Sequence, residues 1–258
     1  MIPTRRAVLS SLTPVLFGAA FFALWQGFVV WRDIKPYLLP TPASVVRNAV
    51  DSSHLLRSSA IVSGTNALVG LIAGVVVGTV AAVLTNRLRI VAEVLTPLAI
   101  AVNAVPIIVI TSFLNNMYSA RSQLPRRLMV AVVVFFVVFV NVTRGLRQSD
   151  PTQTELMRSY AANDRQMLAK VRLPTALPHL FTAIRIASPL SVITAFVAEY
   201  FGGTQDGLGY RITSAMSTSD DALGWAYVGA ACVLGLAFFA GSSALEAIAV
   251  PWQRRRRE

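Results

Sequence analysis

Long apolar runs separated by short polar stretches dominate this chain of 258 residues. Hydrophobic residues make up 55% of it and charged residues only 14%, whereas about 25% of a typical soluble domain is charged. A helix needs about 20 apolar residues to cross a bilayer, and most of the runs approach or exceed that length. The six runs are Ser11–Trp31, Ile61–Leu84, Ile90–Ser112, Leu128–Val142, Leu180–Phe201 and Ala222–Val250. We therefore expect residues 1–258 to form one all-α membrane domain with six spanning helices.

The fourth run, 128–142, is the weakest candidate for a span. Its length as an α-helix would be only about 22 Å, which is less than the thickness of the hydrocarbon core. The helix must therefore include Leu124 and Pro125, or the side chains of Arg126 and Arg127 must snorkel to the membrane surface.

Arginine and lysine indicate the orientation, because they are in excess on the cytoplasmic side of membrane proteins. With six spans and a cytoplasmic N-terminus, 14 basic residues lie inside and 8 outside; with Arg185, left unassigned, these make up the 23 of the chain. The excess predicts cytoplasmic N- and C-termini. The net charge of +11 is then carried by residues that flank spans and face anionic lipid, so we do not expect nucleic acid as a partner.

The region between the first two runs predicts a short helix at the outer membrane surface. Thr41 can cap its N-terminus and Pro42 suits its first position. Val45 and Val46 then belong to an apolar face. The whole chain is expected to divide into an N-terminal helix (1–37), an outer interfacial helix (38–60), core helices (61–250) that include a cytoplasmic loop (143–179), and a basic C-terminal tail (251–258).

Small residues recur at helical spacing in the second and fifth runs. Gly70, Gly74 and Gly78 lie on one face and favour close approach of another helix. The fifth run has a comparable row, formed by Ser188, Ser191, Ala195 and Ala198. This second row has two interpretations, helix packing or a polar lining for a solute route.

The third run is interrupted by proline at Pro97 and Pro106. Proline leaves backbone groups unbonded that lipid cannot satisfy, so this helix should face protein or water. Glu93 and Glu199 lie near the ends of runs, where snorkelling, a buried pair and proton coupling are all open interpretations. The polar candidates for a translocation path are Asn103, Thr111, Asn115, Ser188, Ser191, Thr194 and Glu199.

The patterns of an enzyme active site are missing from the sequence. A phosphate-binding loop needs a lysine directly after a glycine, and neither lysine, Lys35 or Lys170, has one before it. His54, His179 and the single cysteine, Cys232, have no spacing that suits a metal. We therefore expect no catalytic site, metal or cofactor in this chain.

The charged interruption at 143–179 predicts two short amphipathic helices. Asp150 and Pro151 can start the first, although Thr152 with Glu155 also forms a capping-box pattern. The second begins near Asn163. Their apolar residues, Leu156, Met157, Tyr160 and Ala161 in the first and Met167, Leu168 and Val171 in the second, need a surface to cover them. That surface is either the membrane or a groove in a partner protein.

This loop resembles the cytoplasmic motif of the binding-protein-dependent permeases of ABC importers. The motif reads Glu-Ala-Ala, three residues, Gly, nine residues and Ile-x-Leu-Pro. Here Glu155 begins it, Ala161 stands at the glycine position, and Val171, Leu173 and Pro174 follow after nine residues.

The chain departs from the motif at Leu156 and Met157, which replace the two alanines, and at the glycine position. The segments 198–202 (A-E-Y-F-G) and 207–212 (G-L-G-Y-R-I) resemble the branch that imports nitrate, sulfonates, taurine or pyrimidine-type vitamin precursors. The resemblance extends from about residue 38 to the C-terminus.

The resemblance implies the type I ABC importer permease fold, a location in a bacterial plasma (inner) membrane, and a separate ATPase that binds ATP and Mg. Two ATP-binding subunits, a second permease subunit (the same chain or a related one) and an extracytoplasmic solute-binding protein would be its partners. The residues expected to couple to the ATPase are Glu155, Met157, Tyr160, Ala161, Leu168, Val171, Leu173 and Pro174. Glu155 would be the charged contact. The alternative is an ion-coupled secondary transporter that uses Glu93, Glu199 and the interrupted third run.

Overall fold

The computed structural model describes residues 5–118, 122–202 and 206–251, and these ranges contain helices and loops but no strand. The helices of the first half are α1 (Arg5–Trp31), α2 (Pro42–Asp51), α3 (Ser53–Arg87), α4 (Arg89–Asn103), α5 (Ile107–Met117) and α6 (Leu124–Arg147). Those of the second half are α7 (Pro151–Ser159), α8 (Asp164–Met167), the π-helical turn η1 (Leu168–Arg172), α9 (Leu173–Tyr200), α10 (Leu208–Ser217) and α11 (Asp221–Ala249). The prediction of an all-α protein is confirmed.

Four helices of the described chain are long and apolar enough to cross a membrane: α3, α6, the continuous helix Asp164–Tyr200 and α11. Shorter apolar helices occur at Leu16–Trp31 and Ile107–Met117. The third run, which we expected to form one helix, is divided into α4 and α5 by residues 104–106. Pro106 accounts for this break, because proline cannot donate a backbone hydrogen bond and disfavours helical geometry in the residue before it.

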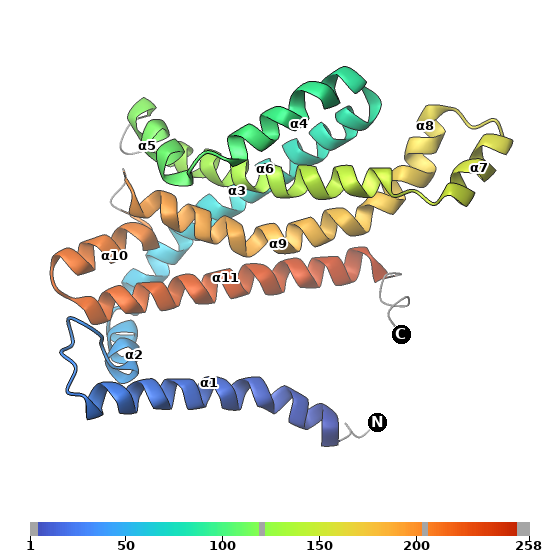
Figure 1. Cartoon of the computed structure of the whole chain (residues 1–258). Coiled ribbons are helices and arrows are strands. Elements are labelled where there is room, and N and C mark those ends of the chain that lie inside the picture. The colour runs from blue at the N-terminus through green and yellow to red at the C-terminus, as the bar shows by residue number, and fades with distance from the viewer. Residues whose placement is uncertain (1–4, 119–121, 203–205, 252–258) are drawn as a thin grey trace.

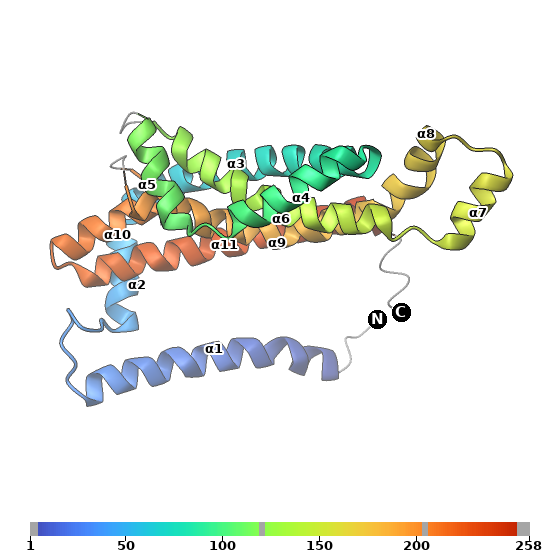
Figure 2. The same ribbon diagram turned by 45° about the horizontal axis from the view of Figure 1, so that its top comes forward.

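Helix α6 lies at the centre of the bundle, where it packs against α3 on one side and α9 on the other. Helix α11 packs along α9, and the short α10 contacts both of them at one end. Figures 1 and 2 show α1 apart from this bundle, joined to it through α2. They also show the start of α1, the end of α11 and the α7–α8 segment at one end of the molecule, with α2, α5 and α10 at the other.

The contact between α3 and α6 is made by three glycines and three valines in matching register. A Cβ atom added to Gly74 would lie 2.6 Å from Val134 Cβ and 2.7 Å from Ala131 O. Gly70 and Gly78 meet Val130 and Val138 in the same way. Because both rows repeat every four residues, the two backbones approach each other over three helical turns.

Helix α6 begins at Leu124 and has 24 residues, which rise about 36 Å and suffice to span. The helix thus gains its length by including Leu124 and Pro125. The alternative, in which Arg126 snorkels to the surface, is wrong: its side chain is only 1% exposed. Arg126 Nη1 donates to Ser122 O at 2.9 Å and Nη2 donates to Gly202 O, so its charge is directed into the protein.

Helix α2 starts as the sequence predicts. Thr41 is its N-cap, with Oγ1 accepting a hydrogen bond from Ser44 N at 3.2 Å, and Pro42 is its first residue.

Candidate functional site

The α7–α8 hairpin projects from one end of the bundle (Figures 1 and 2). Helix α7 starts after Asp150, whose Oδ1 accepts a hydrogen bond from Thr152 N at 2.8 Å. Of the two start signals in the sequence, the structure therefore uses Asp150 and not the Thr152–Glu155 pair. Helix α8 starts with a reciprocal capping box, in which Asn163 and Gln166 exchange two hydrogen bonds of 2.9 Å.

The turn between the two helices explains the glycine position of the motif. Ala161 has a φ of 51°, in the left-handed region that favours glycine. Ala161 N donates to Arg158 O at 2.9 Å, and Ala162 N donates to Met157 O at 3.0 Å. These two bonds form a Schellman motif that closes the C-terminus of α7. Alanine here therefore adopts a conformation that glycine would adopt with less strain.

The residues expected to couple to an ATPase fall into two groups in the structure. In the first group, Glu155 is exposed on α7, and Tyr160, the C-cap of α7, is 76% exposed; Leu156, which was not among the expected residues, is 55% exposed beside them. Met157 is partly buried and Ala161 is exposed. The other group is formed by four residues beyond α8, three of which pack inward. Leu168 and Val171 are buried, Leu173 packs against the core, and Pro174 is the exposed second residue of α9.

The buried group joins the hairpin to the bundle without a break. The π-helical turn η1 connects α8 to α9, so that residues Asp164–Tyr200 run as one helix of 37 residues. One side of its first turns faces the protein, and the buried residues on that side are Met167, Leu168 and Val171. The hairpin is therefore anchored through its second helix, while α7 is left largely uncovered.

The far end of the same long helix carries a buried carboxylate. Glu199 is fully buried, and its side chain accepts hydrogen bonds from Ser63 Oγ at 2.6 Å, from Gly209 N at 3.2 Å and from Asn66 Nδ2 at 3.3 Å. Ser63 Oγ in turn accepts a bond from Leu208 N at 2.9 Å. Glu199 thus joins α9 to α3 and to the start of α10.

Two glycines allow this approach. Gly207 has a φ of 100°, and a Cβ on it would lie 2.5 Å from the Glu199 carboxyl carbon. A Cβ on Gly209 would clash with the backbone of Phe196 and Tyr200. The G-L-G pattern therefore brings the N-terminus of α10 against a carboxylate, an arrangement that the helix dipole favours.

The bonds continue from Asn66 to the start of α6. Asn66 Nδ2 also donates to Gln123 Oε1 at 2.8 Å, and Asn66 Oδ1 accepts from Arg127 Nε at 3.1 Å. Gln123 Nε2 donates to both carboxylate oxygens of Asp206, at 3.0 and 3.1 Å. We call the whole group the polar cluster; it consists of Ser63, Asn66, Gln123, Arg126, Arg127, Glu199 and Asp206. It holds two acidic and two basic residues, so its charges are balanced.

The other candidates for a translocation path are turned toward their own helices. The hydroxyls of Thr111, Ser188 and Thr194 donate to carbonyls four residues earlier, and Ser191 donates to Ser188 O. All four side chains are buried. Asn115 Nδ2 is buried without a partner among the described residues, whereas the side chain of Asn103 lies outside those residues, as do residues 252–258 of the basic tail.

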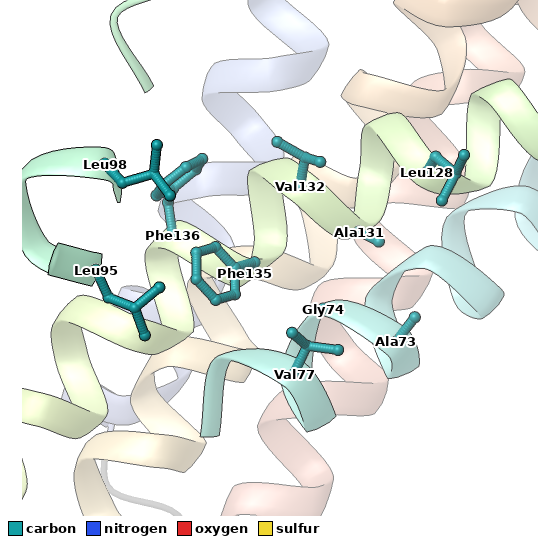
Figure 3. Close-up of a pocket in the computed structure, with 10 residues that line it drawn as sticks. All are labelled: Ala73, Gly74, Val77, Leu95, Leu98, Leu128, Ala131, Val132, Phe135 and Phe136. Atoms are coloured by element: carbon teal, nitrogen blue, oxygen red, sulfur yellow. The ribbon is translucent and has the colours of Figure 1, made fainter. Parts of the chain in front are cut away.

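An apolar pocket of about 310 Å³ lies among α3, α4 and α6 (Figure 3). It is lined by Ala73, Gly74, Val77, Leu95, Leu98, Leu128, Ala131, Val132, Phe135 and Phe136. No lining side chain carries a hydrogen-bonding group, so the pocket has no means of recognising a polar solute.

Sequence reasoning identified Glu199 but missed most of its partners. Ser63 and Asn66 are polar residues one turn apart inside an apolar run, and Gly207 and Gly209 flank a single leucine. These two signals could have indicated that the four residues take part in buried contacts. They could not have indicated Glu199 as the partner, because Ser63 and Glu199 are 136 residues apart in the chain.

The comparisons with known proteins agree with one another and cover most of the chain. Residues 74–257 match the family of binding-protein-dependent transport system inner membrane components. The formylaminopyrimidine transport permease protein ThiX of Halalkalibacterium halodurans is 31% identical over 255 residues, covering 95% of this chain and 98% of the relative. The riboflavin transport system permease protein RibX of Chloroflexus aurantiacus is 25% identical over 231 residues, covering 89% and 85%.

A solved structure, of an amino acid ABC transporter with histidines, resembles the fold with a TM-score of 0.65 and 17% sequence identity. The match covers 76% of this chain and 95% of that chain. At this identity the likeness concerns the fold alone.

Proposed function

The chain belongs to the family of binding-protein-dependent transport system inner membrane components, and on that basis we propose that it is the permease subunit of an ATP-driven importer. As a family member it is a multi-pass component of the inner membrane and an ABC transporter permease. The observation that carries the proposal is the α7–α8 hairpin, which presents uncovered apolar side chains beside Glu155 in a chain whose sequence lacks a phosphate-binding loop.

The proposed topology has six crossings, made by α1, α3, α4 with α5, α6, α9 and α11. In Figure 1 these segments run alternately toward and away from the hairpin end. The first residues of α1 and the last residues of α11 lie on the hairpin side, which supports cytoplasmic N- and C-termini. The loop 143–179 would then be cytoplasmic, and α2, α10 and the polar cluster would lie at the outer end.

The proposed coupling contact is α7, seated in a groove of an ATP-binding subunit that carries ATP and Mg. Glu155 would make the charged contact, and Leu156 and Tyr160 would supply apolar area. The buried residues Leu168 and Val171 serve a different role, since they fix α8 to the bundle. Motion of α7 would thereby reach α9 directly, and two copies of the permease, or this chain and a related one, would move together.

The proposed solute is small and is delivered by an external binding protein. A pyrimidine-type vitamin precursor is the first candidate, because a relative named for formylaminopyrimidine transport matches nearly the whole chain. The sulfonate, nitrate and taurine group is the second candidate, on the sequence of segments 198–202 and 207–212. Binding measurements on the partner binding protein with a pyrimidine, a sulfonate and nitrate distinguish the two.

The coupling role is tested by Glu155→Ala in the complete transporter reconstituted in vesicles. ATP-driven uptake is expected to fall about ten-fold, since one charged contact to the ATPase is lost. Asp51→Ala removes an exposed carboxylate from the outer helix α2 and is expected to leave uptake unchanged. Unchanged uptake in Glu155→Ala would count against the assignment.

The energy source of uptake distinguishes an ATP-driven importer from an ion-coupled transporter. Uptake that vanadate abolishes and ionophores leave intact supports the ATP-driven reaction. Uptake that ionophores abolish while vanadate has no effect would favour the ion-coupled alternative that uses Glu93 or Glu199.

A further inference from the structure

A polar cavity of about 290 Å³ lies at the root of the hairpin. Its walls come from the last turns of α3 and α6, the loop after α6, helix α7 and the turn η1. The lining residues are Asn86, Leu146, Arg147, Ser149, Thr154 and Arg172. The cavity therefore lies where two membrane helices end and α9 begins.

The lining carries two positive charges and no carboxylate. Arg172 Nη1 donates to Asn86 Oδ1 at 2.8 Å, which holds one guanidinium in place. Arg147 forms neither a hydrogen bond nor an ion pair within the described part of the chain. The neighbouring acid, Asp150, is exposed and its Oδ1 caps α7 at Thr152 N. Two guanidinium groups at one cavity, with nothing acidic in its lining, favour an anionic ligand.

A buried hydroxyl points to the same kind of ligand. Ser149 Oγ is shielded from solvent and has no hydrogen-bond partner among the described residues. A buried donor without a partner costs free energy that an acceptor oxygen would recover. A tetrahedral oxyanion can accept bonds from a hydroxyl and from two guanidinium groups at once.

We propose that this cavity binds a phosphate group, supplied either by the headgroup of an anionic phospholipid or by free phosphate. Helices α3 and α6 are long and apolar enough to span a bilayer, so their ends are expected near the headgroup phosphates, and basic pockets between membrane helices are known to bind such headgroups. A bound phosphate would link α6 and η1 to the base of α7. The site goes beyond the proposed import function, which does not require it.

The test uses the full chain, purified in the assembly in which it leaves the membrane and placed in bilayer discs. Three conditions are compared: phosphatidylcholine alone, phosphatidylcholine with phosphatidylglycerol, and phosphatidylcholine with inorganic phosphate. Retention of phosphatidylglycerol is measured by native mass spectrometry, and the midpoint of thermal unfolding is measured in every condition. We expect phosphatidylglycerol to be retained and to raise the midpoint.

The main variant is Arg147→Gln, which removes a guanidinium that makes no bond within the described structure and so should not affect folding. Retention is expected to fall about ten-fold, as one charge-assisted contact is lost. Arg158→Gln is the matched control, because it removes the same charge from an exposed position on α7 that does not line the cavity. This control is expected to retain phosphatidylglycerol as the parent does.

Each outcome decides the proposal. A rise in the midpoint with phosphatidylglycerol alone identifies lipid as the source, and a rise with inorganic phosphate identifies free phosphate. An equal loss in Arg147→Gln and Arg158→Gln would show unspecific attraction to the membrane and overturn the site. An unchanged midpoint with both phosphatidylglycerol and inorganic phosphate would overturn it as well. Because no transport is measured, these results do not depend on the proposed import function.

Discussion

The two ends of this molecule differ in which side chains they bury: one buries polar side chains and the other exposes apolar ones. At the end that holds α2, α5 and α10, the buried carboxylate of Glu199 is hydrogen-bonded to the polar side chains of Ser63 and Asn66. At the hairpin end, apolar residues such as Tyr160 stand exposed with nothing to cover them. The hydrogen bonds of Glu199 are all made within one chain, whereas the exposed apolar side chains of the hairpin have no cover among the described residues. Folding should therefore depend on the Glu199 end and assembly on the hairpin end.

Replacement of the central carboxylate should have the largest effect. Glu199→Ala leaves Ser63 Oγ and Gly209 N without an acceptor and removes one of the two acidic residues that balance the arginines of the polar cluster. We expect a loss of about 3–5 kcal/mol in the free energy of unfolding, typical of breaking a buried charged group. The measurement is the unfolding transition of the purified protein in detergent micelles.

The control for Glu199→Ala is Glu155→Ala, which removes an exposed carboxylate at the other end. It is expected to change the free energy of unfolding by less than about 0.5 kcal/mol. Equal effects of the two replacements would remove the distinction between the two ends.

A smaller loss is expected from Gly207→Ala. The residue has a φ of 100°, and a Cβ would lie 2.5 Å from the carboxyl carbon of Glu199. Strain and overpacking together should cost about 2 kcal/mol, visible as a lower midpoint of unfolding. In Gly229→Ala the new methyl group meets no atom within 4 Å, so the midpoint should stay or rise slightly. A Gly207→Ala protein as stable as its parent would contradict the tight closure of α10 on Glu199.

At the hairpin end, Tyr160→Ala should weaken assembly and leave stability unchanged. Its ring is 76% exposed, so little packing within the chain is lost. Association with the ATP-binding subunit should weaken about ten-fold, as for an aromatic anchor in an interface. Co-purification and titration with that subunit measure the effect.

Tyr37→Ala provides the comparison for Tyr160→Ala. Tyr37 is also a tyrosine, 65% exposed, but it lies in the loop between α1 and α2 at the opposite end. Association should be unaffected. If both variants bind the ATP-binding subunit like the parent, the hairpin is not the docking surface.

The smallest effect is a gain, expected from Ala161→Gly. Glycine adopts the φ of 51° found here without the steric strain of alanine, so the variant should be more stable by about 1 kcal/mol. Protection of the α7 amides from hydrogen exchange should increase. Ala162→Gly, one residue later and without a positive φ, should instead decrease it. A decrease in both variants would contradict the strain at Ala161.

Features set by local chemistry could be predicted from the sequence. Thr41 and Pro42 predicted the start of α2, and Asn163 predicted that of α8, because a cap depends on residues within one turn. The helical class and the family followed from apolar runs and from the motif spacing between Glu155 and Pro174.

What the sequence could not supply was the pairing of distant residues. One of the two alternatives had the side chains of Arg126 and Arg127 reach the membrane surface, but Arg126 instead donates a hydrogen bond to Gly202 O. Likewise, Leu168 and Val171 share the apolar pattern of the exposed residues, and only the packing of η1 on the bundle separates the two groups. Pro106 was recognised as a disturbance, yet whether it bends or divides a helix depends on its surroundings.

The continuous helix Asp164–Tyr200 has a mechanical consequence. Its 37 residues rise about 55 Å, so that a tilt of about 10° would move one end by roughly 10 Å relative to the other. Pro174, Pro178 and Pro189 lie inside it, and each removes one backbone hydrogen bond, which softens the helix at three points. Part of any displacement that enters at the hairpin would thus be absorbed as bending. The displacement that reaches Glu199 therefore depends on the stiffness of the helix at these prolines as well as on the displacement of the hairpin.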